Sequence, residues 1–89
     1  MNGAIGSVET RSLAGAIVAA DAMVKSARVK IEDFRVVGSG LVAVTVTGEV
    51  AAVQTSVDSG REAAERMCEV VSANVIPRPH GEVAKLLEP

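Results

Sequence analysis

Aromatic residues are almost absent from this 89-residue sequence, in which Phe34 is the only one. Recognition of single-stranded nucleic acid relies on stacking bases against aromatic side chains. Pockets for larger ligands are also commonly lined by aromatic rings. The net charge of −2 and the pI of about 5.3 give no sign of the basic patch that a polyanion-binding protein usually carries. We therefore expect no nucleic-acid partner.

Cysteine and histidine are equally scarce, with one of each at Cys68 and His80. A single cysteine allows no disulfide within the chain, and one cysteine with one histidine cannot form a standard zinc site. The pattern around Cys68 predicts a small buried hydrophobic side chain, because a catalytic thiol would want a nearby histidine and an electropositive setting. We expect no metal, no cofactor and no catalytic residue.

Long apolar runs and an N-terminal targeting signal are also lacking. The opening MNGAIGSVET has no basic segment followed by an apolar one. No apolar stretch approaches the roughly 20 residues of a membrane-spanning helix. The sequence predicts a cytoplasmic protein with no membrane partner, organised as one small domain over residues 1–89.

Small apolar residues are present in excess, since 48% of the sequence is hydrophobic, mostly as alanine and valine. A domain of this size buries only about 60–65% of the surface of its unfolded chain. The surplus apolar surface therefore predicts an interface between subunits.

Hydrophobic periodicity predicts an element order of β-α-β-β-α-β. Strands are expected at residues 4–8, 28–37, 41–47 and 70–77, and helices at 12–25 and 48–67, with a short terminal helix at 81–87. This order is that of the ferredoxin-like split βαβ fold. We expect an α/β (α+β) domain with an antiparallel sheet and both main helices on one of its faces.

Apolar spacing also predicts which side of each helix is buried. The expected buried stripes are Leu13, Ile17, Ala20 and Val24 on the first helix, and Val50, Val53, Val57, Ala64 and Met67 on the second. Gly60 lies inside the second stripe and indicates either close packing or a bend. Charged residues 61, 62, 65 and 66 form the expected solvated face.

The segment Gly38-Ser39-Gly40 joins two valine-rich strands. A dinucleotide-binding loop would need a third glycine at position 43 and a helix directly after it, and neither is present. Spacing alone therefore predicts a hairpin turn.

Three longer segments carry a family resemblance: VETRSLAGAIVAADAMVKSA, VVGSGLVAVTVTGEVAAV and NVIPRPHGEV. They make the sequence similar to bacterial microcompartment (BMC) shell proteins of the single-domain, hexamer-forming class. The resemblance covers about residues 5–86 and implies the shell-protein variant of the same fold. It implies a structural protein that forms a cyclic homo-hexamer with a central pore for polar metabolites. Its partners would be neighbouring shell hexamers, other shell proteins, and encapsulated enzymes or their targeting peptides, in a shell within the bacterial cytoplasm.

The same resemblance implies roles for individual residues. Gly38, Ser39 and Gly40 would line the pore, and the expected residues of the edge between hexamers are Lys25, Arg28, Arg78 and His80. Val36 stands where many relatives carry lysine, which leaves Arg35 as a partial replacement for that charge. Without the resemblance, the alternative hypothesis is a small ferredoxin-like regulatory protein that forms oligomers and binds a metabolite between its subunits.

Overall fold

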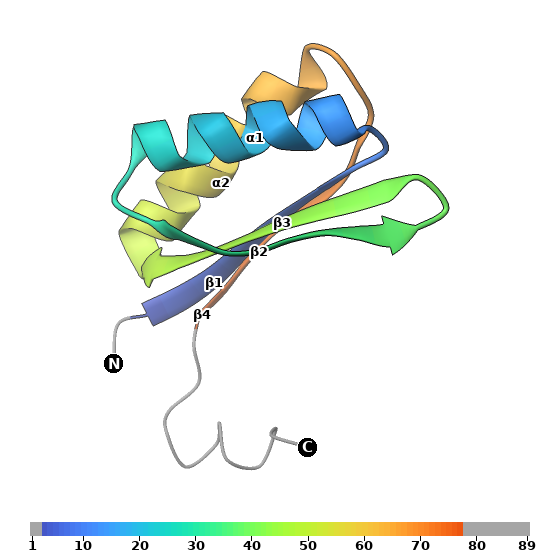
Figure 1. The fold of residues 1–89 in the computed structure, drawn as a ribbon. Helices are drawn as coiled ribbons and strands as arrows, with labels where there is room; N and C mark the ends of the chain where they lie inside the picture. The colour runs from blue at the N-terminus through green and yellow to red at the C-terminus, as the bar shows by residue number, and fades with distance from the viewer. Residues whose placement is uncertain (1–2, 78–89) are drawn as a thin grey trace, which may run out of the picture.

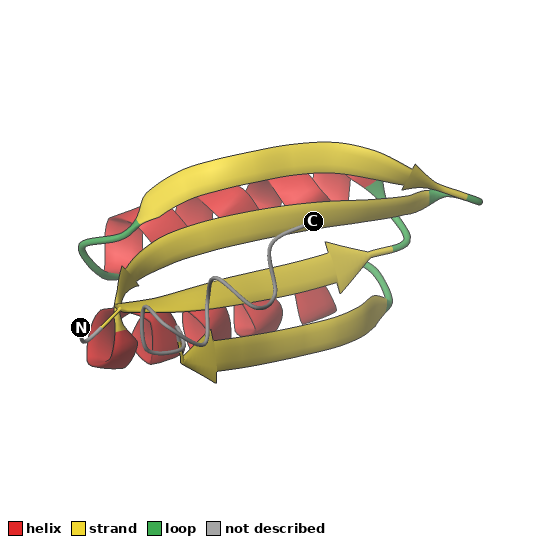
Figure 2. Cartoon of the chain, turned by 90° about the horizontal axis from the view of Figure 1, so that it is seen from below, coloured by secondary structure: helices red, strands yellow, loops and turns green. Residues whose placement is uncertain are grey.

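The computed structural model describes residues 3–77, which form one antiparallel sheet covered on one face by two helices (Figure 1; Figure 2). Along the chain the elements are β1 (Gly3–Thr10), α1 (Leu13–Ser26), β2 (Lys30–Gly38), β3 (Leu41–Glu49), α2 (Val50–Glu65) and β4 (Val70–Pro77). The strand order β2-β3-β1-β4 confirms the predicted ferredoxin-like arrangement. The terminal helix expected at residues 81–87 lies outside the described residues.

The two central strands, β1 and β3, supply the sheet side of the core. Side chains alternate between buried and half-buried along both strands, because successive residues of a strand point to opposite faces. Val42, Val44 and Val46 face the helices with exposed fractions of 3%, 0% and 0%, as their alternation predicts. The opposite face, which we call the open face, carries the half-buried residues between them.

Helix α1 begins one residue after the predicted start, and Ser12 is its N-cap. The Ser12 hydroxyl oxygen accepts a hydrogen bond from the backbone N–H of Gly15 at 3.0 Å, which satisfies one of the free donors of the first turn. The Thr10 hydroxyl in turn donates to the carbonyl of Ser12 at 2.7 Å. These bonds fix the corner between β1 and α1.

The predicted buried stripe of α1 is wrong. Leu13, Ile17 and Val24 are 54%, 55% and 43% exposed, and only Ala20 of that set is buried. The buried face consists of Gly15, Ala16, Ala19, Ala20 and Met23. The physical reason is the short distance between α1 and α2, which only small side chains and one flexible methionine can fill.

Gly60 of α2 sets that distance. A Cβ atom added to Gly60 would lie 2.5 Å from Met23 Cγ and 3.2 Å from the carbonyl oxygen of Ala19. Gly60 therefore marks close packing between the helices and not a bend. The Ser56 hydroxyl is also buried and donates to the carbonyl of Met23 at 3.2 Å, which adds a hydrogen bond between α2 and α1.

The expected second helix is shorter in the structure. Gly48 and Glu49 belong to β3, and α2 ends at Glu65. Val53, Val57 and Ala64 are buried as predicted, whereas Val50 and Met67 are 38% and 50% exposed, since they lie at or beyond the ends of the helix. Cys68 is half-buried, and its thiol donates to the carbonyl of Ala64 at 3.4 Å.

Gly6, on the helix side of β1, provides a direct test of this packing. A Cβ atom there would lie 2.5 Å from Val57 Cγ2 and 2.6 Å from Val53 Cγ1, so Gly6→Ala should lower the free energy of unfolding by about 1–3 kcal/mol through overpacking. Ser7→Ala, on the open face of the same strand, is the control and should change it by less than about 0.5 kcal/mol. Urea unfolding at one fixed protein concentration measures both; equal stability of Gly6→Ala and the parent would contradict this packing.

Candidate functional site: the β2–β3 hairpin and the sheet flanks

The Gly38-Ser39-Gly40 segment forms the tip of the hairpin between β2 and β3 (Figure 1). Gly38 pairs with Leu41, so Ser39 and Gly40 are the two central residues of the turn. Their φ angles are 54° and 76°, the signs of a type I′ turn, whose twist matches that of the flanking strands. Gly38 has a φ of 125°, a value that glycine tolerates far better than other residues.

The hairpin tip stands clear of the rest of the described chain. No heavy atom beyond the chain neighbours lies within 4 Å of a Cβ built at Gly38 or Gly40, and Ser39 is exposed. The Ser39 hydroxyl and the backbone amides of the turn are therefore available to a molecule outside this subunit.

Strand β2 carries an ion pair close to the tip that sequence reasoning did not single out. Arg35 Nε donates to Asp33 Oδ2 at 2.5 Å. Asp33 and Arg35 pair with Thr45 and Ala43 of β3, which places both side chains on the open face. Opposite charges two residues apart on a predicted strand were the available signal, because such residues share a face.

The two expected edge residues within the described chain lie at the other end of the domain. Lys25 is in the last turn of α1, is 74% exposed and pairs with Asp21 Oδ2 at 2.9 Å. Arg28 is exposed in the connection to β2. Strand β2 has nine residues and therefore separates Arg28 from the hairpin tip by roughly 30 Å.

The end of β4 lies at that same end of the sheet. Pro77 pairs with Ala4, which also pairs with Gly48, and the first residue of β2, Lys30, pairs with the adjacent Thr47. Arg78 and His80, the other expected edge residues, lie outside the described residues. The structure thus separates the two predicted sites instead of bringing them together.

Exposed apolar side chains gather on the α1–β2 side of the domain. On α1, Leu13, Ile17 and Val24 lie roughly 110° around the helix from the buried stripe, at 3.6 residues per turn. Ala19 and Gly15 face α2 and Cys68, so this exposed stripe is on the side away from α2, above β2. We call the following set the α1–β2 flank: Leu13, Ile17, Val24, Ile31, Phe34 and Val36.

The β2 members of this flank lie on the helix side of the sheet yet remain open to solvent. Ile31, Phe34 and Val36 pair with Val46, Val44 and Val42, whose side chains are buried under the helices. On β2 the exposed fractions are 38%, 38% and 66%, because β2 is an edge strand that α1 covers only in part. A row of apolar side chains on an edge strand is a typical surface for another chain.

The opposite edge strand, β4, has a smaller apolar set. Val71 and Ile76 are 41% and 61% exposed, and within residues 3–77 β4 is hydrogen-bonded to a neighbouring strand on one side only. We call Val71 and Ile76 the β4 flank. Ile76 pairs with Ile5 on the open face, and Val71 lies at the register shift near the other end of β4. The two edges of the sheet therefore differ, with a broad apolar flank on one and two separate apolar side chains on the other.

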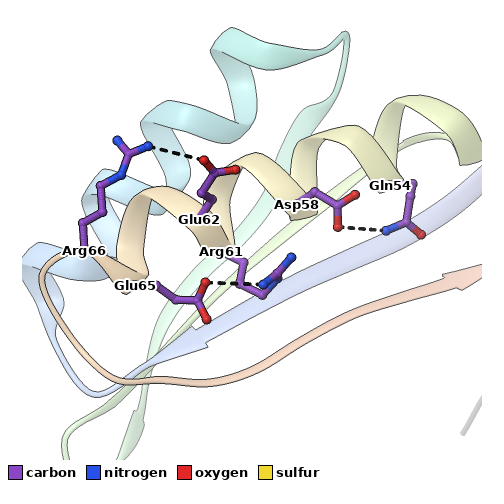
Figure 3. Close-up of polar contacts among 6 residues, drawn as sticks. All are labelled: Gln54, Asp58, Arg61, Glu62, Glu65 and Arg66. Atoms are coloured by element: carbon purple, nitrogen blue, oxygen red, sulfur yellow. Dashed lines mark hydrogen bonds and ion pairs between the residues drawn. The ribbon is translucent and has the colours of Figure 1, made fainter.

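The outer face of α2 is polar by contrast (Figure 3). Arg61 pairs with Glu65 at 3.3 Å, Arg66 with Glu62 at 3.4 Å, and the Gln54 amide donates to Asp58 at 3.1 Å. All are one helical turn apart, the spacing that stabilises a solvated helix. This confirms the solvated face expected for residues 61, 62, 65 and 66.

Within residues 3–77, no group of three or more His, Cys, Asp or Glu side chains is arranged to hold a metal ion. Neither helix of that span has the length and apolar character needed to cross a membrane.

Comparison with known proteins gives one consistent result. The family profile described as "BMC domain" matches residues 4–79. The bacterial microcompartment shell protein PduA of Citrobacter freundii is 52% identical over 84 residues, which is 94% of this chain and 90% of that protein. The shell protein EutM of Escherichia coli is 48% identical, covering 93% and 86%, and the carboxysome shell protein CcmK2 of Synechocystis is 45% identical, covering 98% and 86%.

A solved structure described as a microcompartments protein from Desulfitobacterium hafniense has the same fold. It superposes with a TM-score of 0.82 at 38% identity over 93% of this chain. The chain spans 45% of the length of that protein.

The geometry of the turn can be tested without reference to assembly. Gly40→Ala should lower the free energy of unfolding by about 1–2 kcal/mol, because the alanine Cβ disfavours left-handed backbone. The loss is conformational and not steric, since the surrounding space is open. Ser39→Gly is the control and should change stability by less than about 1 kcal/mol. Glycine relieves the strain of the positive φ angle at this position, and this gain offsets the greater conformational freedom of glycine in the unfolded chain. Urea unfolding in which Gly40→Ala matches the parent would contradict this turn.

Proposed function

Because the chain belongs to the BMC domain family of bacterial microcompartment shell proteins, we propose that it forms a cyclic homo-hexamer whose central pore is lined by Gly38, Ser39 and Gly40. The chain is a structural protein of the microcompartment shell and not an enzyme. The ring, the pore and the contacts between rings are the parts of this function that we propose here.

The observation that carries the proposal is the difference between the two edges of the sheet, with the broad apolar α1–β2 flank on one and the separate side chains Val71 and Ile76 on the other. A closed ring is built by a head-to-tail interface, in which one surface of each subunit meets a different surface of the next. The α1–β2 flank and the β4 flank have this relation, because β2 and β4 are the two edges of one sheet. Pairing them around a ring would cover both apolar sets and both unpaired strand edges.

The hairpin tip fits the centre of such a ring. It lies at the opposite end of β2 from Lys25 and Arg28, so a tip at the axis places these two cations at the rim. The selectivity of a narrow polar constriction rests on its diameter and its hydrogen-bonding groups. The Ser39 hydroxyl and the amides of the turn would supply those groups to polar metabolites, one set from each subunit.

Contacts between rings would involve Lys25, Arg28, Arg78 and His80. The long Lys25 stem can pack along a flat contact while its ammonium group stays hydrated, and an arginine offers several donors to carbonyl oxygens of a neighbour. The proposed partners are neighbouring hexamers, other shell proteins, and encapsulated enzymes or their targeting peptides.

The ring is tested by placing a charge on the α1–β2 flank. Ile17→Asp should dissociate the ring into monomers, because an unpaired carboxylate would be buried at the interface. Val18→Asp is the matched control, since Val18 neighbours Ile17 on the same helix but points away from β2, and it should leave the ring intact. Native mass spectrometry should give the parent protein at six times the chain mass of 9.1 kDa. A parent protein that stays a dimer or trimer, or an Ile17→Asp hexamer, would overturn the proposal.

The rim is tested separately. Lys25→Ala should leave the hexamer intact and reduce the size and number of sheets seen by electron microscopy, because the packed lysine stem is lost. Arg66→Ala removes a cation of similar exposure from the outer face of α2 and should leave sheet growth unchanged. Sheets of Lys25→Ala that equal those of the parent would show that Lys25 is not a rim contact.

A further inference from the structure

The charges nearest to the tip along the two strands of the hairpin form an ion pair with each other. Residues 36–48 contain no charged side chain, so Asp33 and Arg35 are the ionised groups closest to the tip along either strand. Arg35 is three residues from Gly38, which corresponds to roughly 10 Å along a strand. This is slightly longer than the Debye length of about 8 Å at physiological ionic strength, so salt weakens the field of an unpaired Arg35 at the tip without abolishing it.

Asp33 is the group that cancels this charge. It accepts from Arg35 Nε at 2.5 Å, and its side chain is only 38% exposed against 68% for Arg35. The other carboxylate on this part of the open face, Glu9, lies on β1 beyond Ala43 and already accepts a hydrogen bond from the Ser72 hydroxyl at 2.5 Å. Among the described residues, Asp33 is therefore the direct counter-charge of Arg35.

The other side of the hairpin carries no charge either. Val36 lies on the helix side of the sheet and is 66% exposed. The tip is thus approached by apolar side chains on one face and by a neutral ion pair on the other.

From this arrangement we propose that Asp33 determines the charge selectivity of the opening. By pairing with Arg35 in every subunit, Asp33 prevents a ring of cations around the tip, and the opening favours small uncharged molecules with hydroxyl or carbonyl groups over anions. Rings of like-charged side chains are what give a narrow pore its ion preference. This inference rests on the proposed ring, because only a ring multiplies one charge around an axis.

The experiment compares four proteins: the parent, Asp33→Asn, Glu32→Gln and the double variant Asp33→Asn/Arg35→Gln. Each is first shown to be a hexamer by native mass spectrometry, and a sheet of its hexamers is then placed across a nanoscale aperture in a solid support under a gradient of KCl. The zero-current potential gives the ratio of chloride to potassium permeability. Glu32→Gln is the matched control, since it removes the same charge from the adjacent position without freeing Arg35.

The parent and Glu32→Gln should show a permeability ratio within about twofold of unity, and Asp33→Asn should raise it at least about fivefold, as expected when a charge ring forms at a constriction. The double variant should return to the value of the parent. Hexamers in which Asp33→Asn leaves the ratio unchanged, or in which the double variant stays anion-selective, overturn this inference and leave the proposed function standing. A chain that forms no hexamer overturns both.

Discussion

The arrangement of the whole domain depends on the close contact between α1 and α2. Gly60 lies against Met23 and the carbonyl of Ala19 with no room for a side chain, and this distance is compatible only with a buried α1 face of glycine, alanine and one methionine. Between α1 and α2, close packing of small side chains supplies the dispersion contacts that large aliphatic side chains usually supply in a small core. The larger apolar residues of α1 are consequently left on its flank, where they are free to contact another subunit.

The second constraint is the difference in charge between the two ends of β2. One end of this strand follows the cations Lys25 and Arg28, and the other end leads through a neutral, valine-rich stretch into the glycine-containing turn. A single strand thus connects the two surfaces to which different roles are assigned, and the rigidity of the sheet fixes the distance between them. The same strand is the edge that α1 covers only in part, so rim, interface and tip are all organised by β2.

Much of the fold could be predicted from sequence, because the alternation in residues 41–47 and the apolar run over residues 70–77 are local signals. The turn at Gly38-Ser39-Gly40 was predictable for the same reason. The buried face of α1 was not, since periodicity favours the largest apolar residues and does not tell an internal core from an interface between subunits. The pairing of Asp33 with Arg35 depends on which face of β2 each residue occupies, and the register shifts in β2 are set by tertiary structure.

The most direct measurement is a cryo-electron microscopy map of the assembled parent protein at side-chain resolution. The expected map shows sixfold rings in which Ser39 of every subunit faces the axis, and in which Leu13, Ile17 and Phe34 are covered by the β4 side of the next subunit. A ring with Ser39 at its periphery, or an assembly in which Leu13 and Ile17 remain open to solvent, would contradict the proposed architecture.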